Sequence, residues 1–556
     1  MNLIKTTTFA IAFAFTLLAS GQQAKPLFTD ESASKFIAGQ TDLKEKADEF
    51  KKAALTAYAK NDFLEAAENL RVSKILSIIS ASGSKLPNAL KSYMLSDSDF
   101  RREFLDILSD KDEIANVLGI LGALWENSPE KFKAFKSLAI AISVVFDTQP
   151  PESWPHSQVS TTVLPRALPD PVKSFNYWIS MRERGRLLMQ PEKLSAEELK
   201  FLVSSISSDE DKEWVQSSIQ VNISNISKLY QSIKYDSPRL SRNAYTWEYS
   251  DYSLKTIKEK GGICTDQSYY TCEVAKARGV PAFILSGAGA DGFHAWVAYM
   301  ERNGKWNFNV GRYESSRFVT GRTIDPQTWY LASDHSLKSM SERFRSGKKY
   351  QANEIFTMFA KEFFSDGEYE KCIAACNMAN SQDSRNVETW NLLIEALEKS
   401  NAVETKIREA YIAAMRSFSR YPDTDIIFRR ALIKRLDAAG EESESEKLSS
   451  SIIIKTKGSR PDIAMEFARS SLEGEIARGE TEKFYSSYKR LISMFKSDGA
   501  MAFSGITIPI LNSLIAAEKK DEAKQTMAIS RSVLKPSKNS TLESNMRSVE
   551  NQINSL

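Results

Sequence analysis

The sequence predicts an α+β protein in which one small unit of helix and strands lies between mostly α-helical flanks. Apolar residues follow helical spacing from about Asp42 to Phe146 and again from Tyr350 to the end of the chain. Residues 253–313 break this pattern, because short apolar runs alternate there with turn signals such as Asn303-Gly304. The flanks are therefore predicted to be helical, and the stretch between them to contain the strands.

The first 21 residues have the organisation of a secretory signal peptide. Lys5 supplies one positive charge, residues 9–18 are almost all apolar, and small residues follow at 19–21. The apolar run is shorter than the roughly 20 residues that a membrane-spanning helix needs. We expect an exported bacterial protein, periplasmic or secreted, whose mature chain starts near Gln22 and has no membrane span.

Composition and length limit the class of protein. The net charge is +3, with 74 basic and 71 acidic residues interspersed along the chain, so nothing indicates a nucleic-acid partner. The 556 residues exceed a single domain of about 100–200 residues. The predicted organisation is a signal peptide (1–21), an N-terminal helical domain (22–146), a proline-rich linker (147–172), a helical lead-in (173–234), a central α+β domain (235–345) and a C-terminal helical domain (346–556).

Both helical flanks contain segments that resemble tetratricopeptide repeats. Residues 53–67 form two runs of small apolar residues on either side of Asn61-Asp62, as a helix hairpin would. Residues 364–397 combine a Gly-Glu-Tyr turn with a later Trp-Asn-Leu-Leu helix, which is again the rhythm of such repeats. Repeat arrays present extended surfaces, so the flanks are predicted to bind a protein partner.

Two further features are expected to be structural rather than chemical. His156 lies in the linker, which the six prolines between residues 147 and 171 predict to be extended, and a solvated side chain is favoured there. Cys372 and Cys376 share one helix face beside other small residues, which favours packing over a disulfide or a metal site. No metal or organic cofactor is predicted.

Cys264 is the candidate nucleophile. It follows Gly261-Gly262 and comes just before a predicted helix at 265–278. A cysteine at the amino end of a helix meets the positive end of the helix dipole, which lowers the thiol pKa from its usual value of about 8.5. Asp266 opposes this effect, so a histidine is expected to supply most of the activation. Cys272, two turns further on, is interpreted as a packing residue.

His294 is the candidate base. It is one of only three histidines, and it lies on a predicted strand at 293–300 that follows an earlier strand at 280–285. A third strand at 305–310 is joined to it through Asn303-Gly304, a pair typical of tight hairpin turns.

A third residue should hold the histidine ring in the useful orientation. In a hairpin with a two-residue turn, the face shared with His294 carries Asn307, Asn309, Gly311 and Tyr313. Asn309 is the predicted third residue, since an amide can orient an imidazole as a carboxylate does. This register places Asn309 opposite Ala298, about 13 Å from His294 at about 3.3 Å per residue, so a longer turn or a β-bulge would have to shift the pairing. Tyr313, opposite His294 in the unshifted register, is the next candidate.

Together these residues resemble the transglutaminase-like superfamily of papain-like thiol enzymes. The matching blocks are Gly-Gly-Ile-Cys-Thr-Asp at 261–266, Arg-Gly-Val-Pro-Ala at 278–282, His-Ala-Trp at 294–296 and a strand that starts at Trp306. The resemblance covers about residues 252–313 and implies a papain-like core, in which a helix packs on an antiparallel sheet. It also implies Cys264 as nucleophile and His294 as base, with Asn309 at the position where the family has an aspartate.

The function that follows is thiol-dependent acyl transfer on peptide amide bonds. The main-chain N–H of Cys264 is one candidate oxyanion donor, and Gln231 or Trp247 could add a second. Hydrolysis is favoured over cross-linking, because water far exceeds any competing amine outside the cytoplasm. The alternative is a binding or scaffold protein whose helical repeats carry the function and whose central domain is a degenerate, non-catalytic module.

Overall fold

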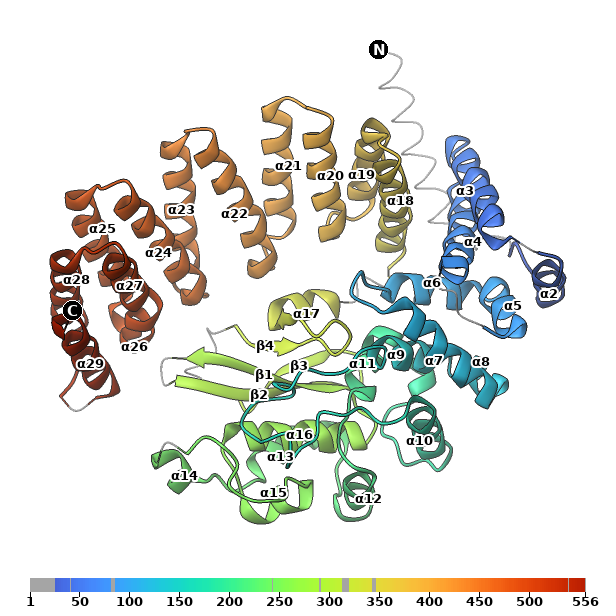
Figure 1. Ribbon diagram of the computed structural model, residues 1–556, viewed down its shortest axis with the longest axis horizontal. Coiled ribbons are helices and arrows are strands. Elements are labelled where there is room, and N and C mark those ends of the chain that lie inside the picture. Colours follow the sequence, from blue (N-terminus) through green and yellow to red (C-terminus); the bar gives the residue numbers. More distant parts are fainter. Residues whose placement is uncertain are drawn as a thin grey trace.

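The computed structural model describes residues 26–555, except residues 41, 82–85, 243, 290–291, 313–319, 343–346 and 539. The predicted signal peptide (1–21) and Tyr313 lie outside the described residues. Helices dominate the rest, and one small five-stranded antiparallel sheet lies in the middle, which confirms the α+β class with helical flanks. Figure 1 shows successive helices forming an arch on one side of this sheet.

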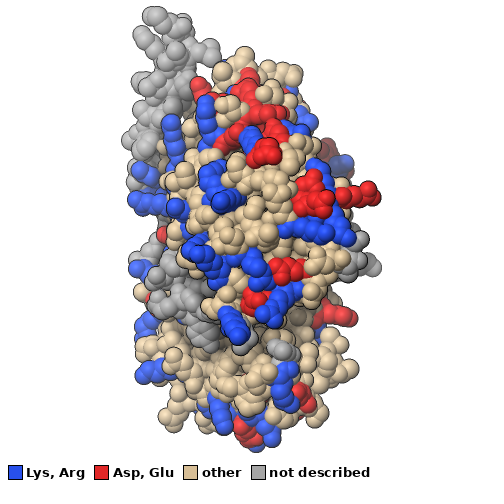
Figure 2. Space-filling model, turned by 90° about the vertical axis from the view of Figure 1, so that its left-hand side faces the viewer, with Lys and Arg blue, Asp and Glu red and all other residues tan. Residues whose placement is uncertain are grey.

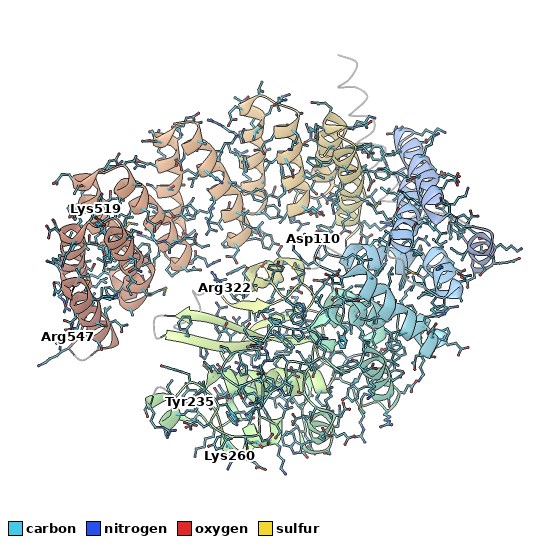
Figure 3. The ribbon with its side chains drawn as sticks, in the orientation of Figure 1. Asp110, Tyr235, Lys260, Arg322, Lys519 and Arg547 are labelled. Carbon is cyan, nitrogen blue, oxygen red and sulfur yellow. The ribbon has the colours of Figure 1, made fainter. Side chains whose placement is uncertain are left out.

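The sheet has the strand order β3-β2-β1-β4-β5. Its strands are β1 (Ala282–Gly289), β2 (Gly292–Met300), β3 (Trp306–Val310), β4 (Arg322–Ile324) and β5 (Leu331–Ser333). Helix α16 (Cys264–Ala277) packs on one face, and α17 (Asp334–Met340) lies on the side of the arch. Figure 3 labels Arg322 on the arch side and Tyr235 on the α16 side.

Alternation along β2 divides the interior of the central domain into two cores. Val297 and Tyr299 pack in the core that contains α16, whereas Trp296 and Ala298 pack with Leu337 of α17. The strand is therefore buried on both faces, which explains its nearly continuous apolar sequence.

The N-terminal helices form a core that extends beyond the predicted boundary at residue 146. They are α2 (Asp30–Gly39), α3 (Leu43–Ala59), α4 (Phe63–Ala81), α5 (Asn88–Ser96), α6 (Ser98–Ile107), α7 (Ile114–Asn127), α8 (Pro129–Ala134) and α9 (Lys136–Val145). Trp178 of α10 (Pro171–Glu183) and Leu199 of α11 (Ala196–Val203) lie in the same core. The predicted lead-in at 173–234 is thus not a separate unit, because its first two helices complete the N-terminal core.

The proline-rich connector and the rest of the lead-in belong to the central domain. Val159 and Leu164 of the connector lie in the same core as Val215 and Tyr269. The helices of this part are α12 (Asp209–Ser218), α13 (Ser227–Gln231), α14 (Ser237–Ser241) and α15 (Leu254–Lys260). The connector lies over neighbouring surfaces, as the prolines predict, and its apolar side chains anchor it there.

The C-terminal region is helical throughout, as predicted. Its helices are α18 (Lys348–Ser365), α19 (Tyr369–Gln382), α20 (Val387–Lys399), α21 (Glu404–Ser417), α22 (Pro422–Ala438), α23 (Glu442–Thr456), α24 (Pro461–Ala477), α25 (Thr481–Met494), α26 (Gly499–Ala502), α27 (Ile508–Ala516), α28 (Lys520–Leu534) and α29 (Thr541–Ser555). From α18 to α25 each helix packs against the next one in sequence, and these helices form the arch. On the face in Figure 2, basic and acidic side chains are interspersed.

The hairpin α3–α4 packs at the start of this arch. Tyr58 stacks near Phe359 with ring centroids 4.4 Å apart, and Phe63 meets Phe356 at 4.8 Å. Lys74 forms an ion pair with Glu362 at 2.5 Å. The repeat-like hairpin predicted at residues 53–67 therefore stacks on α18, although about 290 residues separate them in the sequence. The boundary drawn at residue 146 does not separate the two helical flanks.

One stretch of the described residues, Lys496–Ala516, is long and apolar enough to cross a membrane. Phe503, Ile506, Ile510 and Leu514 within it lie in the hydrophobic core of the last helices. A core helix meets the same criterion of length and apolarity, so this stretch is weak evidence for a membrane span.

Candidate active site

The glycine pair before Cys264 is required by close backbone packing. Gly261 has φ +82°, and a Cβ there would lie 2.4 Å from the carbonyl oxygen of Lys234. A Cβ on Gly262 would lie 2.4 Å from the Cβ of Asp266. Gly262 N–H also donates to the Lys234 carbonyl at 2.9 Å. The pair thus lets the chain turn tightly into α16, whose first residue is Cys264.

Asp266 holds the start of α16 in place. Its carboxylate accepts hydrogen bonds from Ile263 N–H at 2.8 Å and from the Tyr252 hydroxyl at 2.9 Å. It also forms a fully buried ion pair with Arg239 at 2.5 Å. The repulsion between Asp266 and a Cys264 thiolate, expected from the sequence, is therefore reduced, because Arg239 compensates the charge.

Cys264 is half-buried at the amino end of α16, as predicted. Hydrogen bonding to the main-chain N–H groups of Ala295 and Thr265 lowers the pKa of its thiol, but burial has the larger effect and raises the pKa. The depressed pKa expected from the helix dipole is thus wrong. Among the four cysteines, only Cys372 has a lowered pKa, through a hydrogen bond with Cys376.

His294 is buried on β2, with its Nε2 atom 2.7 Å from the carbonyl oxygen of Gly311. A carbonyl oxygen can only accept, so Nε2 carries the proton of the neutral ring and Nδ1 is the basic nitrogen. Burial lowers the pKa of His294, and the bond to Gly311 offsets part of this shift. The ring is therefore neutral at pH 7 and able to accept a proton.

Tyr230 connects the cysteine helix to the histidine strand. Its hydroxyl donates to the Ala295 carbonyl at 2.8 Å and lies 3.5 Å from the Cys264 carbonyl oxygen. Its ring lies against Gly311, where an added Cβ would be 2.4 Å from a ring carbon. Gly311 has φ +82°, so both its conformation and its space require glycine. No local pattern in the sequence marks Tyr230 for this bridging role, and its neighbour Gln231 is predicted there only as an oxyanion donor.

Cys264 and His294 line one cleft of about 370 Å³. Its walls come from α16, from β1 and β4, and from residues 153–158 of the connector. Apolar side chains, including Trp154, Phe201 and Phe283, make up much of the lining. The two predicted reactive side chains therefore share a partly apolar cleft.

Within the described residues, no hydrogen bond joins Asn309 to His294. Asn309 is exposed, and within the described residues its side chain hydrogen-bonds to Arg312, at 3.3 Å, and to no atom of His294. The loop between β2 and β3 is longer than a two-residue turn, and a β-bulge lies between the pairs Tyr299–Asn307 and Val297–Val310. The longer loop shifts the strand pairing by one residue relative to a two-residue turn, and the bulge shifts it back. Asn309 therefore stays at the level of Ala298, as in the unshifted register. The carbonyl oxygen of Gly311, rather than the Asn309 side chain, accepts the hydrogen bond from His294 Nε2.

His156 is half-buried and belongs to a hydrogen-bond network, so it is not the solvated linker side chain that the sequence favours. Its Nδ1 accepts from Gln158 N–H at 3.3 Å, so Nε2 donates to the Tyr252 hydroxyl at 3.1 Å, and that hydroxyl donates to Asp266. Burial, reinforced by Arg166 and Arg239, lowers the pKa of His156 to about 3. The connector is thereby tied to the first turn of α16.

The other sequence-predicted residues take structural positions. Trp247 Nε1 donates to the Asp251 carbonyl at 2.9 Å, and Gln231 is exposed, so neither of these two predicted oxyanion donors lines the cleft. The first amides of α16, on Cys264 and Thr265, remain suited to that role. Cys272 is buried, and burial raises its pKa to about 12, in agreement with a packing role. Cys372 and Cys376 are likewise buried and form no disulfide.

Neither protein-family models nor curated proteins match this chain. The interpretation of the site therefore depends on its own geometry.

Proposed function

We propose that this protein is an exported, papain-like thiol enzyme that cleaves peptide amide bonds, with Cys264 as nucleophile and His294 as base. One observation carries the proposal: a cysteine at a helix amino end and a histidine with a fixed tautomer line the same cleft. Because the Gly311 carbonyl holds Nε2–H, the basic Nδ1 is the nitrogen that can take the thiol proton.

The chemistry uses a neutral thiol and a neutral imidazole. His294 takes the proton as Cys264 Sγ attacks the amide carbonyl carbon, and the carbonyl oxygen becomes an oxyanion near the first amides of α16. The imidazolium then gives its proton to the departing amine, and the C–N bond breaks to leave a thioester. Water attacks the thioester with His294 again as base, which releases the acid and restores the thiol.

The form of the cleft supports a peptide substrate. Strand β4 pairs with β1 only at Ser286, so within the described chain residues 283–285 of β1 have no strand partner on that side. Phe283 and Ile284 of this stretch line the cleft. An extended peptide can pair with such a strand edge while its side chains occupy apolar pockets. Hydrolysis rather than cross-linking is proposed, because water outcompetes amines as acyl acceptor outside the cell.

A peptide-based electrophile that forms a covalent adduct with thiols tests the proposal. Intact-mass and peptide mapping should find one adduct, at Cys264, and the adduct should be absent in Cys264→Ala. His294→Ala should slow labelling, while Cys272→Ala, a buried cysteine two turns along the same helix, serves as the matched control and should label normally. Labelling that persists in Cys264→Ala contradicts the assignment.

The alternative function is a non-catalytic scaffold. The observation in its favour is that burial raises the pKa of the Cys264 thiol, while the helices form a continuous arch suited to a protein partner. If this alternative holds, Cys264→Ala keeps full biological activity, and a peptide library is cleaved no faster by wild type than by the variant.

A further inference from the structure

A cluster of one histidine and two carboxylates joins the central domain to the helical arch. Asp334 and His335 begin α17, beside the sheet, whereas Asp423 lies in the first turn of α22. One side-chain ligand atom from each of the three residues lies within 4.8 Å of the others. The cluster is separate from Cys264 and His294, and the proposed peptidase chemistry does not use it.

Two carboxylate oxygens of this cluster are buried without a hydrogen bond. Asp334 is 4% exposed, and its Oδ1 atom has no hydrogen-bond partner among the described residues. Oδ2 of Asp423 is likewise buried and without a partner. A buried polar atom that makes no hydrogen bond is unfavourable, so both oxygens would gain from a bound ligand.

In each of these two carboxylates, the other oxygen forms an ion pair with an arginine. Arg312 contacts Oδ2 of Asp334 at 3.2 Å, and Arg460 contacts Oδ1 of Asp423. These contacts hold both carboxylates in place and leave one oxygen of each without a partner among the described residues, as outer partners hold metal ligands. The two arginines also compensate part of the negative charge of the carboxylates, so the cluster does not carry two uncompensated negative charges.

The spacing fits shared ligation better than a direct ion pair. His335 Nε2 lies 3.6 Å from Asp334 Oδ1, which is too long for a hydrogen bond. Two ligands of one tetrahedral Zn²⁺ ion, at about 2.1 Å each, are about 3.4 Å apart. The third ligand atom lies within 4.8 Å of the other two, so its separations must shorten by at most about 1.4 Å to complete the set.

We infer that Asp334, His335 and Asp423 bind a divalent transition-metal ion, with Zn²⁺ the best match, and that this ion fastens α17 to α22. An imidazole with two carboxylates is a ligand set that zinc accepts, whereas Mg²⁺ and Ca²⁺ prefer oxygen ligands alone. Three protein ligands leave the fourth position for water. The bound ion ties the outer face of the sheet to the arch and thereby fixes the relative position of the two parts.

The test is titration of the chelator-treated full-length protein with ZnCl2, followed by calorimetry and by metal analysis after dialysis. Wild type should bind one ion, and Mg²⁺ should not compete. Asp423→Asn and His335→Gln should each weaken binding at least about tenfold. Asp425→Asn is the matched control, since Asp425 lies on the same helix but pairs with Arg429 at 2.9 Å. It should bind as wild type does.

Two further measurements separate this site from the reactive thiol. Cys264→Ala should still bind one Zn²⁺ ion, since a thiol and an imidazole elsewhere could also capture zinc. Hydrogen exchange in α17 and α22 should slow when Zn²⁺ is added, with no change in α29. Absence of binding in wild type, unchanged binding in both Asp423→Asn and His335→Gln, or loss of binding in Cys264→Ala overturns the inference.

Discussion

At the scale of single residues, burial moves the side chains of Cys264 and His294 toward their neutral forms. It raises the pKa of Cys264 and lowers the pKa of His294, so the cleft that both residues line contains a neutral thiol and a neutral imidazole at pH 7. A preformed thiolate–imidazolium pair would need the opposite shifts. In the proposed reaction, the thiol therefore loses its proton during attack on the substrate rather than before it.

We expect a specific pH dependence from this neutral pair. Alkylation of Cys264 by iodoacetamide should keep rising with pH through about 8.5, the pKa of an ordinary thiol, because burial raises the pKa of Cys264. Peptide cleavage should decline only below about pH 6.5, because protonation removes the base and the pKa of His294 is lowered. Rates at each pH are measured by mass spectrometry, with buried Cys272 as the slow reference. An alkylation plateau below pH 7 would reveal a preformed thiolate.

Gly311 should be the most sensitive residue outside the reactive pair. Gly311→Ala places a methyl group 2.4 Å from the Tyr230 ring at φ +82°, so the carbonyl that holds His294 must move. We expect cleavage to fall on the order of a hundredfold, together with a lower Tm.

Gly304→Ala is the matched control for this substitution. Gly304 has a similar φ of +75° in the same hairpin, but no atom lies within 4 Å of an added Cβ. It should lower the Tm through backbone strain while the cleavage rate changes little. Equal loss of activity in the two variants would show that backbone strain, not displacement of the histidine acceptor, is responsible.

The sequence predicts Cys264 and His294 as the reactive pair because local signals mark their positions: a glycine pair before a helix, and an alternating strand. It does not identify Tyr230 or the Gly311 carbonyl. Tyr230 acts through a hydroxyl that reaches Ala295, 65 residues away, and Gly311 through a main-chain atom. Such contacts form between segments that are far apart in the sequence, so no local sequence pattern predicts them. The same holds for His156, whose half-buried position depends on its contact with Tyr252 and not on the proline-rich sequence around it.

At the scale of elements, the hairpin β2–β3 shows how strands can be predicted without their register. The positions of both strands follow from apolar alternation and the Asn303-Gly304 signal. Which residues pair depends on the longer turn and on the bulge between Tyr299 and Val297. These two features shift the register in opposite directions by one residue each, so their effects cancel. A one-residue change at either feature would alter which side chains share a face.

Asn309 should therefore contribute little to cleavage. Asn309→Ala removes an exposed side chain that bonds only to Arg312 within the described chain, so the stability should change by less than about 0.5 kcal/mol. The cleavage rate should remain close to that of wild type, whereas His294→Ala should abolish it. A large loss of rate in Asn309→Ala at unchanged Tm would restore Asn309 as the orienting residue.

At the scale of the whole molecule, the two helical flanks form one body. The α3–α4 hairpin shares a core with α18 to α22, in which Ala54 and Ala66 lie with Phe359 and Leu393. Helical character and the repeat-like rhythm could be predicted on each side, because both are local properties of the sequence. Their association could not, since contacts between segments so far apart leave no periodic signal. Figure 1 shows the consequence, an arch that begins with the N-terminal hairpin.

Phe356 tests whether this association supports the arch. It is fully buried in α18 and meets Phe63 of α4, so Phe356→Ala should destabilise the protein by about 3–5 kcal/mol. Hydrogen exchange should accelerate in both α4 and α18, whereas labelling of Cys264 should persist, because the reactive cleft is built from other elements. Val403→Ala, at a 62% exposed position of the same arch, is the control and should leave exchange unchanged. Faster exchange confined to α18 would show that the N-terminal hairpin is stable without the arch, and that the two flanks fold as separate units.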